Sequence, residues 1–242
     1  MRVVYAVYGD DRAFLEMRRS ANSLREIHPN ATIDCFTNAE GMERVRGAVD
    51  RAHLHETPTR ETDWHDPNFK VSAIHAAAVS PFIFLDNDTL VAGDLSEAWR
   101  LLEDYDIMAV SAPIENQRRA KGMKPLDRYD KIPEAFAEVN SGVLFVRPTE
   151  KSLKCLQAWR DLLSVNPDEL GDQWRLRIAL YEKSPRLMRL SANYNFRLSS
   201  PQSVYGPVRI LHGHHPNIHK VATEINKGSS FRSFFFGRSG NK

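Results

Sequence analysis

Two aspartates separated by a single residue, Asp86 and Asp88, are the side chains in this sequence best placed to do chemistry. They follow residues 81–85, an unbroken apolar run that predicts a strand buried on both faces, as in a parallel sheet. Because side chains two apart in a strand point to the same side, the two carboxylates can converge where open α/β sheets bind ligands. Two hard oxygen ligands suit Mg²⁺ or Mn²⁺, and such a cation suits a diphosphate. The alternative is a helix N-cap or a turn, which Asp and Asn also favour.

Patterns typical of strands and of helices alternate along the chain, which predicts βαβ units and an α/β fold with a mostly parallel central sheet flanked by helices. Residues 53–66 and 113–133 are polar and lack periodicity, so both are expected to be loops, the second long enough for a lid or a binding loop. The expected strands cover residues 3–7, 32–36, 81–85, 105–111, 139–146, 187–190 and 208–211. The expected helices cover residues 11–27, 39–47, 66–79, 150–163 and 169–181, with a further one from residue 94.

The composition is that of an ordinary globular protein, with 42% hydrophobic and 26% charged residues among 242. A net charge of +2 is too near neutral to indicate a nucleic-acid partner. The two cysteines, Cys35 and Cys155, lie far apart in the sequence, so we expect a cytoplasmic, reducing setting without disulfides. The first eight residues lack the length and cleavage site of a signal peptide, and no run of about 20 apolar residues is present to span a membrane.

The C-terminal part of the sequence is basic and aromatic. From residue 207 onward, six Lys and Arg residues stand against one acid, Glu224, and four histidines lie in the same stretch, so an anion would be attracted there. We expect a single domain over residues 1–220 and a tail over residues 221–242. The tail either contacts an anionic membrane surface peripherally, at the inner face of a membrane, or packs on its own domain or a partner subunit. Its aromatic and basic residues include Phe231, Arg232, Phe234, Phe235, Phe236 and Arg238.

Five segments, in chain order, resemble glycosyltransferase family 8, whose members are GT-A-fold enzymes that use nucleotide-diphosphate sugars. The resemblance covers about residues 3–220 and implies a GT-A, or nucleotide-diphospho-sugar transferase, fold. Each segment alone is a weak signal, but the five in the family's order are fairly specific. They are residues 84–95 around Asp86-Asn87-Asp88, then Asn140-Ser141-Gly142, Asp172-Gln173, Asn193-Tyr194-Asn195-Phe196 and Ile210-Leu211-His212-Gly213.

The resemblance implies a divalent metal site formed by Asp86, Asp88 and His212, with His214 as the alternative third ligand. Two carboxylates and one imidazole leave coordination positions open for diphosphate oxygens. The imidazole shifts the expected cation from Mg²⁺ toward Mn²⁺. Such a cation would act as a Lewis acid that stabilises the departing nucleoside diphosphate.

The resemblance also implies the residues that hold the donor. Asn140, Asp172 and Gln173 would act at the reacting carbon of the sugar, the last two through hydrogen bonds to its hydroxyl groups. Lys70 and Lys220 would contact the diphosphate. The full set of implied donor-binding residues is Tyr8, which would stack on the base, with Gly9, Asp10, Lys70, Asn87, Ser141, Gly142 and Lys220.

The implied function is transfer of a sugar from a nucleotide-diphosphate sugar to a hydroxyl group of a glycan, a lipid-linked glycan or a small acceptor. The expected donor is a UDP-sugar, and retention of configuration is expected because family 8 enzymes retain. One alternative is a phosphatase of the haloacid-dehalogenase type, whose first motif also reads Asp-x-Asp after a strand. A nucleotidyltransferase would need a glycine-rich phosphate loop, which residues 8–12 match poorly. A non-catalytic module that binds nucleotide sugars is the third alternative.

Overall fold

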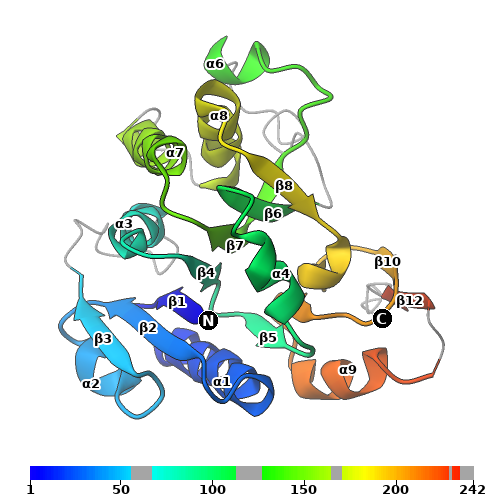
Figure 1. Ribbon diagram of the computed structural model, residues 1–242. Helices are drawn as coiled ribbons and strands as arrows, with labels where there is room; N and C mark the ends of the chain where they lie inside the picture. Colours follow the sequence, from blue (N-terminus) through cyan, green and yellow to red (C-terminus); the bar gives the residue numbers. More distant parts are fainter. Residues whose placement is uncertain (56–66, 113–126, 165–170, 229–230, 235–242) are drawn as a thin grey trace, which may run out of the picture.

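A seven-stranded mixed sheet forms the centre of the protein (Figure 1). The computed structural model describes residues 1–55, 67–112, 127–164, 171–228 and 231–234. The strand order is β3-β2-β1-β4-β7-β6-β8, and neighbours run parallel except that β7 is antiparallel to both β4 and β6. The predicted α/β fold with a mostly parallel sheet is confirmed. The strands are β1 (Arg2–Ala6), β2 (Thr32–Thr37), β3 (Arg51–Leu54), β4 (Phe82–Leu85), β6 (Ile107–Ser111), β7 (Val139–Val146) and β8 (Leu187–Leu190).

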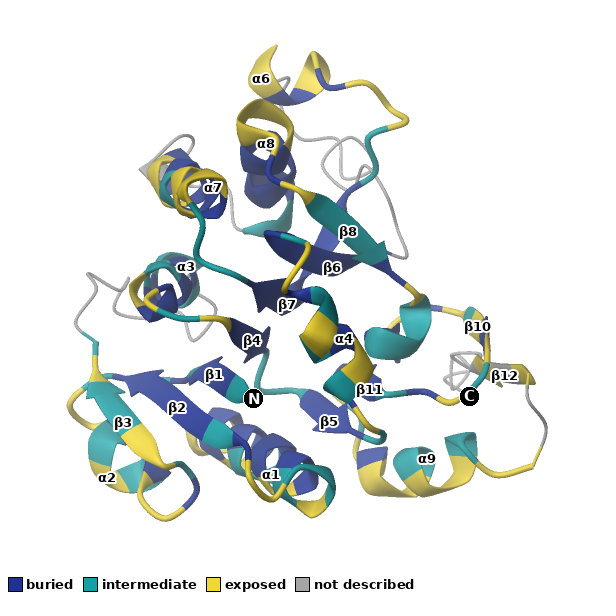
Figure 2. Ribbon diagram, viewed as in Figure 1, coloured by how far each residue is buried: buried dark blue, intermediate teal, exposed yellow. Residues whose placement is uncertain are grey.

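Helices cover both faces of this sheet. The inner strands are largely buried, whereas the edge strands β3 and β8 are partly exposed (Figure 2). Strands β4 and β7 are buried along their whole length because apolar side chains on both faces meet a helical layer. One hydrophobic core joins the sheet to α3 (Pro67–Ala77), α6 (Asp127–Asp130), α7 (Glu150–Asp161) and α8 (Gln173–Lys183). The core on the opposite face contains α1 (Asp11–Ile27), α2 (Gly41–Val45) and α4 (Ser96–Leu101).

A smaller three-stranded sheet lies beside the central one and has the order β5-β11-β9. Strand β5 begins directly after Asp88, and β11 ends at His212, so their antiparallel pairing brings these two distant parts of the chain together. A third hydrophobic core packs this sheet against α9. The elements of this region are β5 (Thr89–Val91), β9 (Phe196–Arg197), β10 (Gln202–Tyr205), β11 (Ile210–His212), β12 (Phe231–Phe234), α9 (Ile218–Ile225) and the 3-10 turn η2 (Ala192–Tyr194).

The structure corrects several boundaries expected from the sequence. The polar segment 53–66 begins inside strand β3, which pairs with β2 at the edge of the sheet and therefore needs no buried alternation. Asp10 caps α1, because its side chain accepts a hydrogen bond of 3.0 Å from Ala13 N. The helix expected over 39–47 shortens to α2, and the one expected from residue 169 begins at Gln173. Most of the expected loop 113–133 lies outside the described residues, and α6 forms within the remainder.

The expected boundary between domain and tail, at residue 220, falls within α9, whose Ile218 and Ile225 pack in the third core. Further along, β12 pairs with β10 in antiparallel register. Phe235, Phe236 and Arg238 of the expected tail lie outside the described residues. None of the described helices is both long enough and apolar enough to cross a membrane.

Candidate functional site

A cavity of about 560 Å³ opens where β1 and β4 end, beside the first residues of β7 and the last residue of β11. Parallel strands deliver their carboxyl ends to the same edge of a sheet, and β7 contributes its beginning there because it runs the opposite way. Many residues singled out in the sequence line this cavity. They are Tyr8, Asp10, Lys70, Asp86, Asn87, Asp88, Asn140, Ser141, Asp172, Gln173, His212 and His214.

Asp86 and Asp88 lie in a turn between β4 and β5 that is held by two backbone hydrogen bonds and by the side chain of Thr89. Asp86 N donates to Gly142 O on β7 at 2.8 Å, and Gly213 N, just after β11, donates to Asp88 O at 3.0 Å. The hydroxyl of Thr89 donates to Asp86 O at 2.7 Å and also contacts Ser20 of α1 at 2.8 Å. The two carboxylates converge as expected, but a turn brings them together, not the alternation of side chains along a strand. The turn that the sequence offered as the alternative to a ligand site is therefore present as well.

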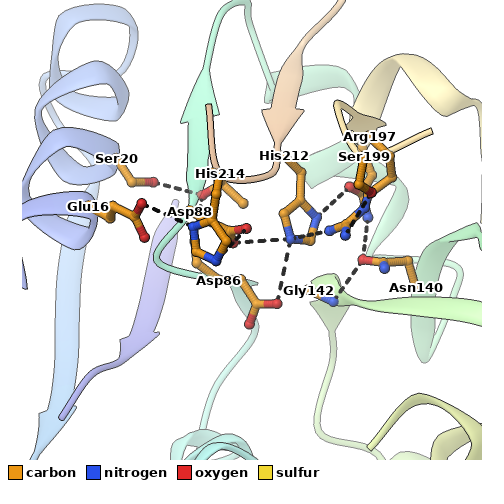
Figure 3. A network of polar contacts seen from close by, with 12 residues as sticks. Glu16, Ser20, Asp86, Asp88, Asn140, Gly142, Arg197, Ser199, His212 and His214 are labelled. Carbon is orange, nitrogen blue, oxygen red and sulfur yellow. Dashed lines mark hydrogen bonds and ion pairs between the residues drawn. The ribbon is translucent and has the colours of Figure 1, made fainter. Parts of the chain in front are cut away.

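Asp86, Asp88 and His212 form a cluster in which each residue offers one ligand atom and these atoms lie within 4.8 Å of one another. His212 Nε2 lies 3.2 Å from Asp88 Oδ1 and 3.6 Å from Asp86 Oδ2 (Figure 3). His212 is 2% exposed, so its ring is held by packing. Burial raises the pKa of Asp88, but the neighbouring His212, His214 and Arg197 together lower it by more, so the pKa lies well below its ordinary value.

A chain of amides fixes the proton of His212 on Nδ1. Nδ1 lies 2.8 Å from Asn195 Oδ1, an oxygen that can only accept. The same Asn195 donates through Nδ2 to Asn140 Oδ1 at 2.9 Å, and Asn140 Oδ1 also accepts from Gly142 N at 3.0 Å. Nε2 faces the two carboxylates and is hydrogen bonded to Arg197 Nη1, a group that can only donate, so Nε2 carries a lone pair. Histidines that bind metals are oriented in this way, by donating their other N–H to a fixed acceptor.

The residues present fit a divalent cation. A neutral nitrogen lone pair facing two carboxylate oxygens is an arrangement of three acceptors, which a cation between them would satisfy. Gly142 keeps this space open, because a Cβ there would lie 2.2 Å from His212 Cε1 and 2.4 Å from Asp86 Oδ2. The set of two oxygens and one imidazole nitrogen suits Mn²⁺, and also Mg²⁺ with more difficulty.

His214, the alternative third ligand, lies farther from the acids. Its Nε2 is 3.9 Å from Asp88 Oδ2, while its Nδ1 lies 3.0 Å from Glu16 Oε1 on α1. The hydrogen bond to Glu16 raises the pKa of His214 above its ordinary value. Of the two histidines, His212 is therefore the one whose Nε2 faces both aspartates.

Lys70 of α3 lies between two carboxylates of the cavity, those of Asp86 and Asp172. Its Nζ lies 2.9 Å from Asp86 Oδ1, 2.9 Å from Asp172 Oδ2 and 3.3 Å from Ser141 Oγ. Burial lowers the pKa of Lys70, but Asp172 and Asp86 raise it by more, so the ammonium stays charged. The lysine expected at a diphosphate thus stands at the strand ends rather than in solvent.

Gln173 and Asn140 are joined to each other and to a buried acid. Asn140 Nδ2 donates to Gln173 Oε1 at 3.2 Å, and Gln173 Nε2 donates to Glu138 Oε2 at 3.1 Å. Glu138 is fully buried, and its other oxygen accepts from the hydroxyl of Tyr129. These bonds fix which end of the Gln173 amide is oxygen and which is nitrogen.

Of the remaining residues expected to bind the donor, some line the cavity and others do not. Tyr8 lines the cavity, with its ring 4.5 Å from that of Phe69, and Asp10 and Asn87 line it too. Gly9 and Lys220 do not line it: both are exposed, and Lys220 lies on α9.

Sequence reasoning missed three charged residues of this region: Glu16, Glu138 and Arg197. Glu16 stands on the buried face of α1 beside Ala13 and Met17, and an acid on an apolar helical face was a readable signal. The position of Glu138 directly before a fully buried strand was a weaker signal. Arg197 reaches the cavity because β9 pairs with β11, and no local pattern in the sequence reveals that pairing.

Known structures share this fold. The galactosyltransferase LgtC, solved in complex with donor and acceptor sugar analogs, aligns with a TM-score of 0.59 and 15% identity over 89% of this chain and 88% of LgtC. Apo mouse xyloside xylosyltransferase 1 gives 0.57 and 13%, over 88% of this chain and 97% of that enzyme. GlyE of Streptococcus pneumoniae TIGR4 gives 0.56 and 16%, over 94% of this chain and 60% of GlyE. At these identities the likeness establishes the fold. No curated protein matches the chain in sequence.

The class defined by this fold and by a cavity at its strand ends is that of the GT-A glycosyltransferases. Within that class, the chain belongs to the nucleotide-diphospho-sugar transferase family, whose profile matches residues 77–200. The matched range contains the Asp86-Asn87-Asp88 turn, the Asn140-Ser141-Gly142 segment and the Asp172-Gln173 pair. Membership of this family argues against the haloacid-dehalogenase alternative, whose chemistry needs a different fold.

Proposed function

We propose that the protein is a metal-dependent glycosyltransferase that moves a sugar from a nucleotide-diphosphate sugar, with a UDP-sugar as the expected donor, to a hydroxyl acceptor. The observation that carries the proposal is the Asp86, Asp88 and His212 cluster, with Nε2 of His212 facing both acids at the edge of the cavity. Bound there, Mn²⁺ or Mg²⁺ would supply Lewis-acid stabilisation of the departing nucleoside diphosphate. The five segments that resemble glycosyltransferase family 8 support the same reading.

The other polar residues of the cavity have roles that follow from their positions. Lys70 presents a charge held near Asp86 and Asp172, where it can neutralise diphosphate oxygens as they become more negative. Gln173 and Asn140 present amides whose orientation is fixed before the sugar arrives, which lowers the cost of ordering them. Tyr8, packed on Phe69, offers an aromatic face to the nucleotide base.

The state of the carboxylates supports retention of configuration. An inverting transfer needs a carboxylate free to take the acceptor's proton. Retention follows from the resemblance to family 8, and in a retaining transfer the leaving phosphate takes that proton instead. Each described carboxylate that lines the cavity already has a partner, in line with this mechanism. The five are Asp10 (with Ala13 N), Glu16 (with Arg12 and His214), Asp86 (with Lys70), Asp88 (with His214) and Asp172 (with Lys70).

Acceptor, domain organisation and location belong to the same proposal. The acceptor is a glycan, a lipid-linked glycan or a small hydroxyl compound, in line with the sugar analogs held by LgtC. One catalytic domain includes the whole of α9, and the basic, aromatic residues that follow it are the part that would contact a membrane surface. The protein works in the cytoplasm, where its free and buried Cys35 and Cys155 stay reduced.

The test is a thermal-shift screen of nucleotide-diphosphate sugars with and without Mn²⁺, followed by a released-nucleotide assay on any hit. A ligand that binds the folded state raises its melting temperature by mass action, so a hit names base and sugar together. Asp88→Asn and His212→Gln should abolish the Mn²⁺-dependent part of both signals. Asp94→Asn, which changes an exposed acid outside the cavity, is the matched control and should change neither.

Two results would overturn this function. Turnover that is unchanged in Asp88→Asn would remove the metal role, and binding of a nucleotide sugar without any release of nucleotide would identify a non-catalytic module.

A further inference from the structure

Arg197 reaches the nitrogen of His212 that the proposed cation would need. Its strand, β9, pairs with β11 so that Arg197 stands directly opposite His212. Arg197 Nη1 is hydrogen bonded to His212 Nε2, and Nη2 lies 3.3 Å from Ser199 Oγ (Figure 3). The main-chain N–H of Arg197 donates to Gln202 Oε1 at 2.9 Å, which fixes the backbone from which the side chain extends.

The guanidinium and a cation cannot use this nitrogen at the same time. Nδ1 of His212 carries the proton, so Nε2 has a single lone pair, and Arg197 donates a hydrogen bond to it. The positive charge of Arg197 also acts on Asp88, whose pKa it helps to lower. In this state Arg197 and Lys70 supply the positive charge that the two aspartates would otherwise take from a metal.

Arg197 therefore has to leave Nε2 when a divalent cation binds, and its charge then stands beside a second positive charge. That repulsion weakens cation binding unless an anion accepts the guanidinium. Arg197, Ser199 and Ser200 all line the cavity proposed for the donor diphosphate. A planar guanidinium matches phosphate oxygens in a bidentate geometry, so the diphosphate is the suitable acceptor.

We propose that Arg197 couples the cation to the diphosphate: it holds His212 Nε2 while the site has no cation, and it moves to the diphosphate when both ligands are bound. The inference rests on the proposed metal-dependent function, and it adds a residue and an order of events to it. Cation alone binds weakly, cation with nucleoside diphosphate binds strongly, and by linkage each ligand strengthens the other by the same factor. The protein thus avoids filling its metal site when no donor is present.

The experiment is calorimetric titration of Mn²⁺ in the absence and presence of saturating UDP, with UDP alone as a third titration. In the wild type, UDP should tighten Mn²⁺ binding by about 10- to 100-fold, within the range of ordinary site-to-site coupling. Arg197→Met keeps the length of the side chain and removes its charge and donors. It should bind Mn²⁺ alone about tenfold more tightly, and the strengthening by UDP should fall by a similar factor.

Two further variants distinguish the effect of the charge of Arg197 from the effects of its planar shape and of its position in the cavity. Arg197→Lys keeps the charge without the planar fork, so it should keep weak binding of Mn²⁺ alone while losing UDP affinity. This variant also serves if Arg197→Met fails to fold. Arg12→Met removes another arginine of the same cavity, one paired with Glu16, and should leave the affinity for Mn²⁺ alone as in the wild type.

The coupling role would be overturned if Arg197→Met bound Mn²⁺ alone with the affinity of the wild type, or if Arg197→Lys bound UDP with the affinity of the wild type. Either result would leave the proposed function standing. Failure of the wild-type protein to bind Mn²⁺ even with UDP present would end the proposed function and the coupling role together.

Discussion

Gly142→Ala should destroy the cation site while leaving the fold in place. The added Cβ would lie 2.2 Å from His212 Cε1 and 2.4 Å from Asp86 Oδ2, whereas carbon atoms in contact prefer about 3.5 Å. The ring of His212 would have to retreat by roughly an ångström, yet it is 2% exposed and its Nδ1 is held by Asn195. Metal–ligand distances tolerate only about 0.2 Å. We expect Mn²⁺ affinity to fall on the order of 100-fold.

The stability of the variant is expected to drop by about 1–3 kcal/mol, the usual cost of an extra methyl group in a packed interior. Mn²⁺ titration in the presence of UDP measures the first effect, and urea unfolding measures the second. Val143→Ile is the matched control, because it adds one methyl-sized group to the opposite face of β7, in the core away from the cluster. A Gly142→Ala protein that binds Mn²⁺ with wild-type affinity would refute the assignment of His212 and Asp86 as ligands.

Three further predictions concern other buried charges. Lys70→Met leaves two neighbouring carboxylates uncompensated and should lower the free energy of unfolding by about 1–3 kcal/mol, allowing for partial exposure. Adding Asp172→Asn should recover part of this loss in a double-mutant cycle measured by urea unfolding. No recovery would contradict the pairing of Lys70 with Asp172. Glu138→Met removes the oxygen that accepts from Gln173 Nε2 and should lower kcat about tenfold with little change in donor KM, measured by steady-state kinetics per folded protein. An unchanged kcat would contradict the role of this hydrogen bond. Asp106→Asn should cost about 1–3 kcal/mol at pH 7, because burial raises the pKa of Asp106 but its bonds to the Arg186 backbone and side chain and to the Arg147 side chain lower it by more. A lowered pKa stabilises the folded state above the unfolded value of 3.8. The difference from wild type in urea unfolding should therefore shrink as the pH falls from about 5 through 3.8, and a difference that already shrinks between pH 7 and about 5 would contradict this.

Local sequence determined the main elements of the fold because their information is carried by neighbouring residues. The strands expected at 139–146 and 187–190 form as β7 and β8 with the same bounds, and the helix expected at 11–27 forms as α1. The apolar pattern of each segment indicates its type of secondary structure, whichever other segment packs against it. The element can therefore be predicted without knowing its packing partner. The Asp86-Asn87-Asp88 sequence likewise marks the end of a buried strand wherever the rest of the chain lies.

Tertiary structure alone decided how the site is assembled. Strands β5 and β9 are too short to be read locally, and they exist because β11 pairs with both of them. That pairing, between segments distant in sequence, brings His212 to the two aspartates and sets Arg197 opposite it. The space in front of Gly142 and the proton position on His212 also depend on contacts among β7, β11 and Asn195. Such contacts depend on distances between chain segments, and a one-dimensional pattern carries no distances.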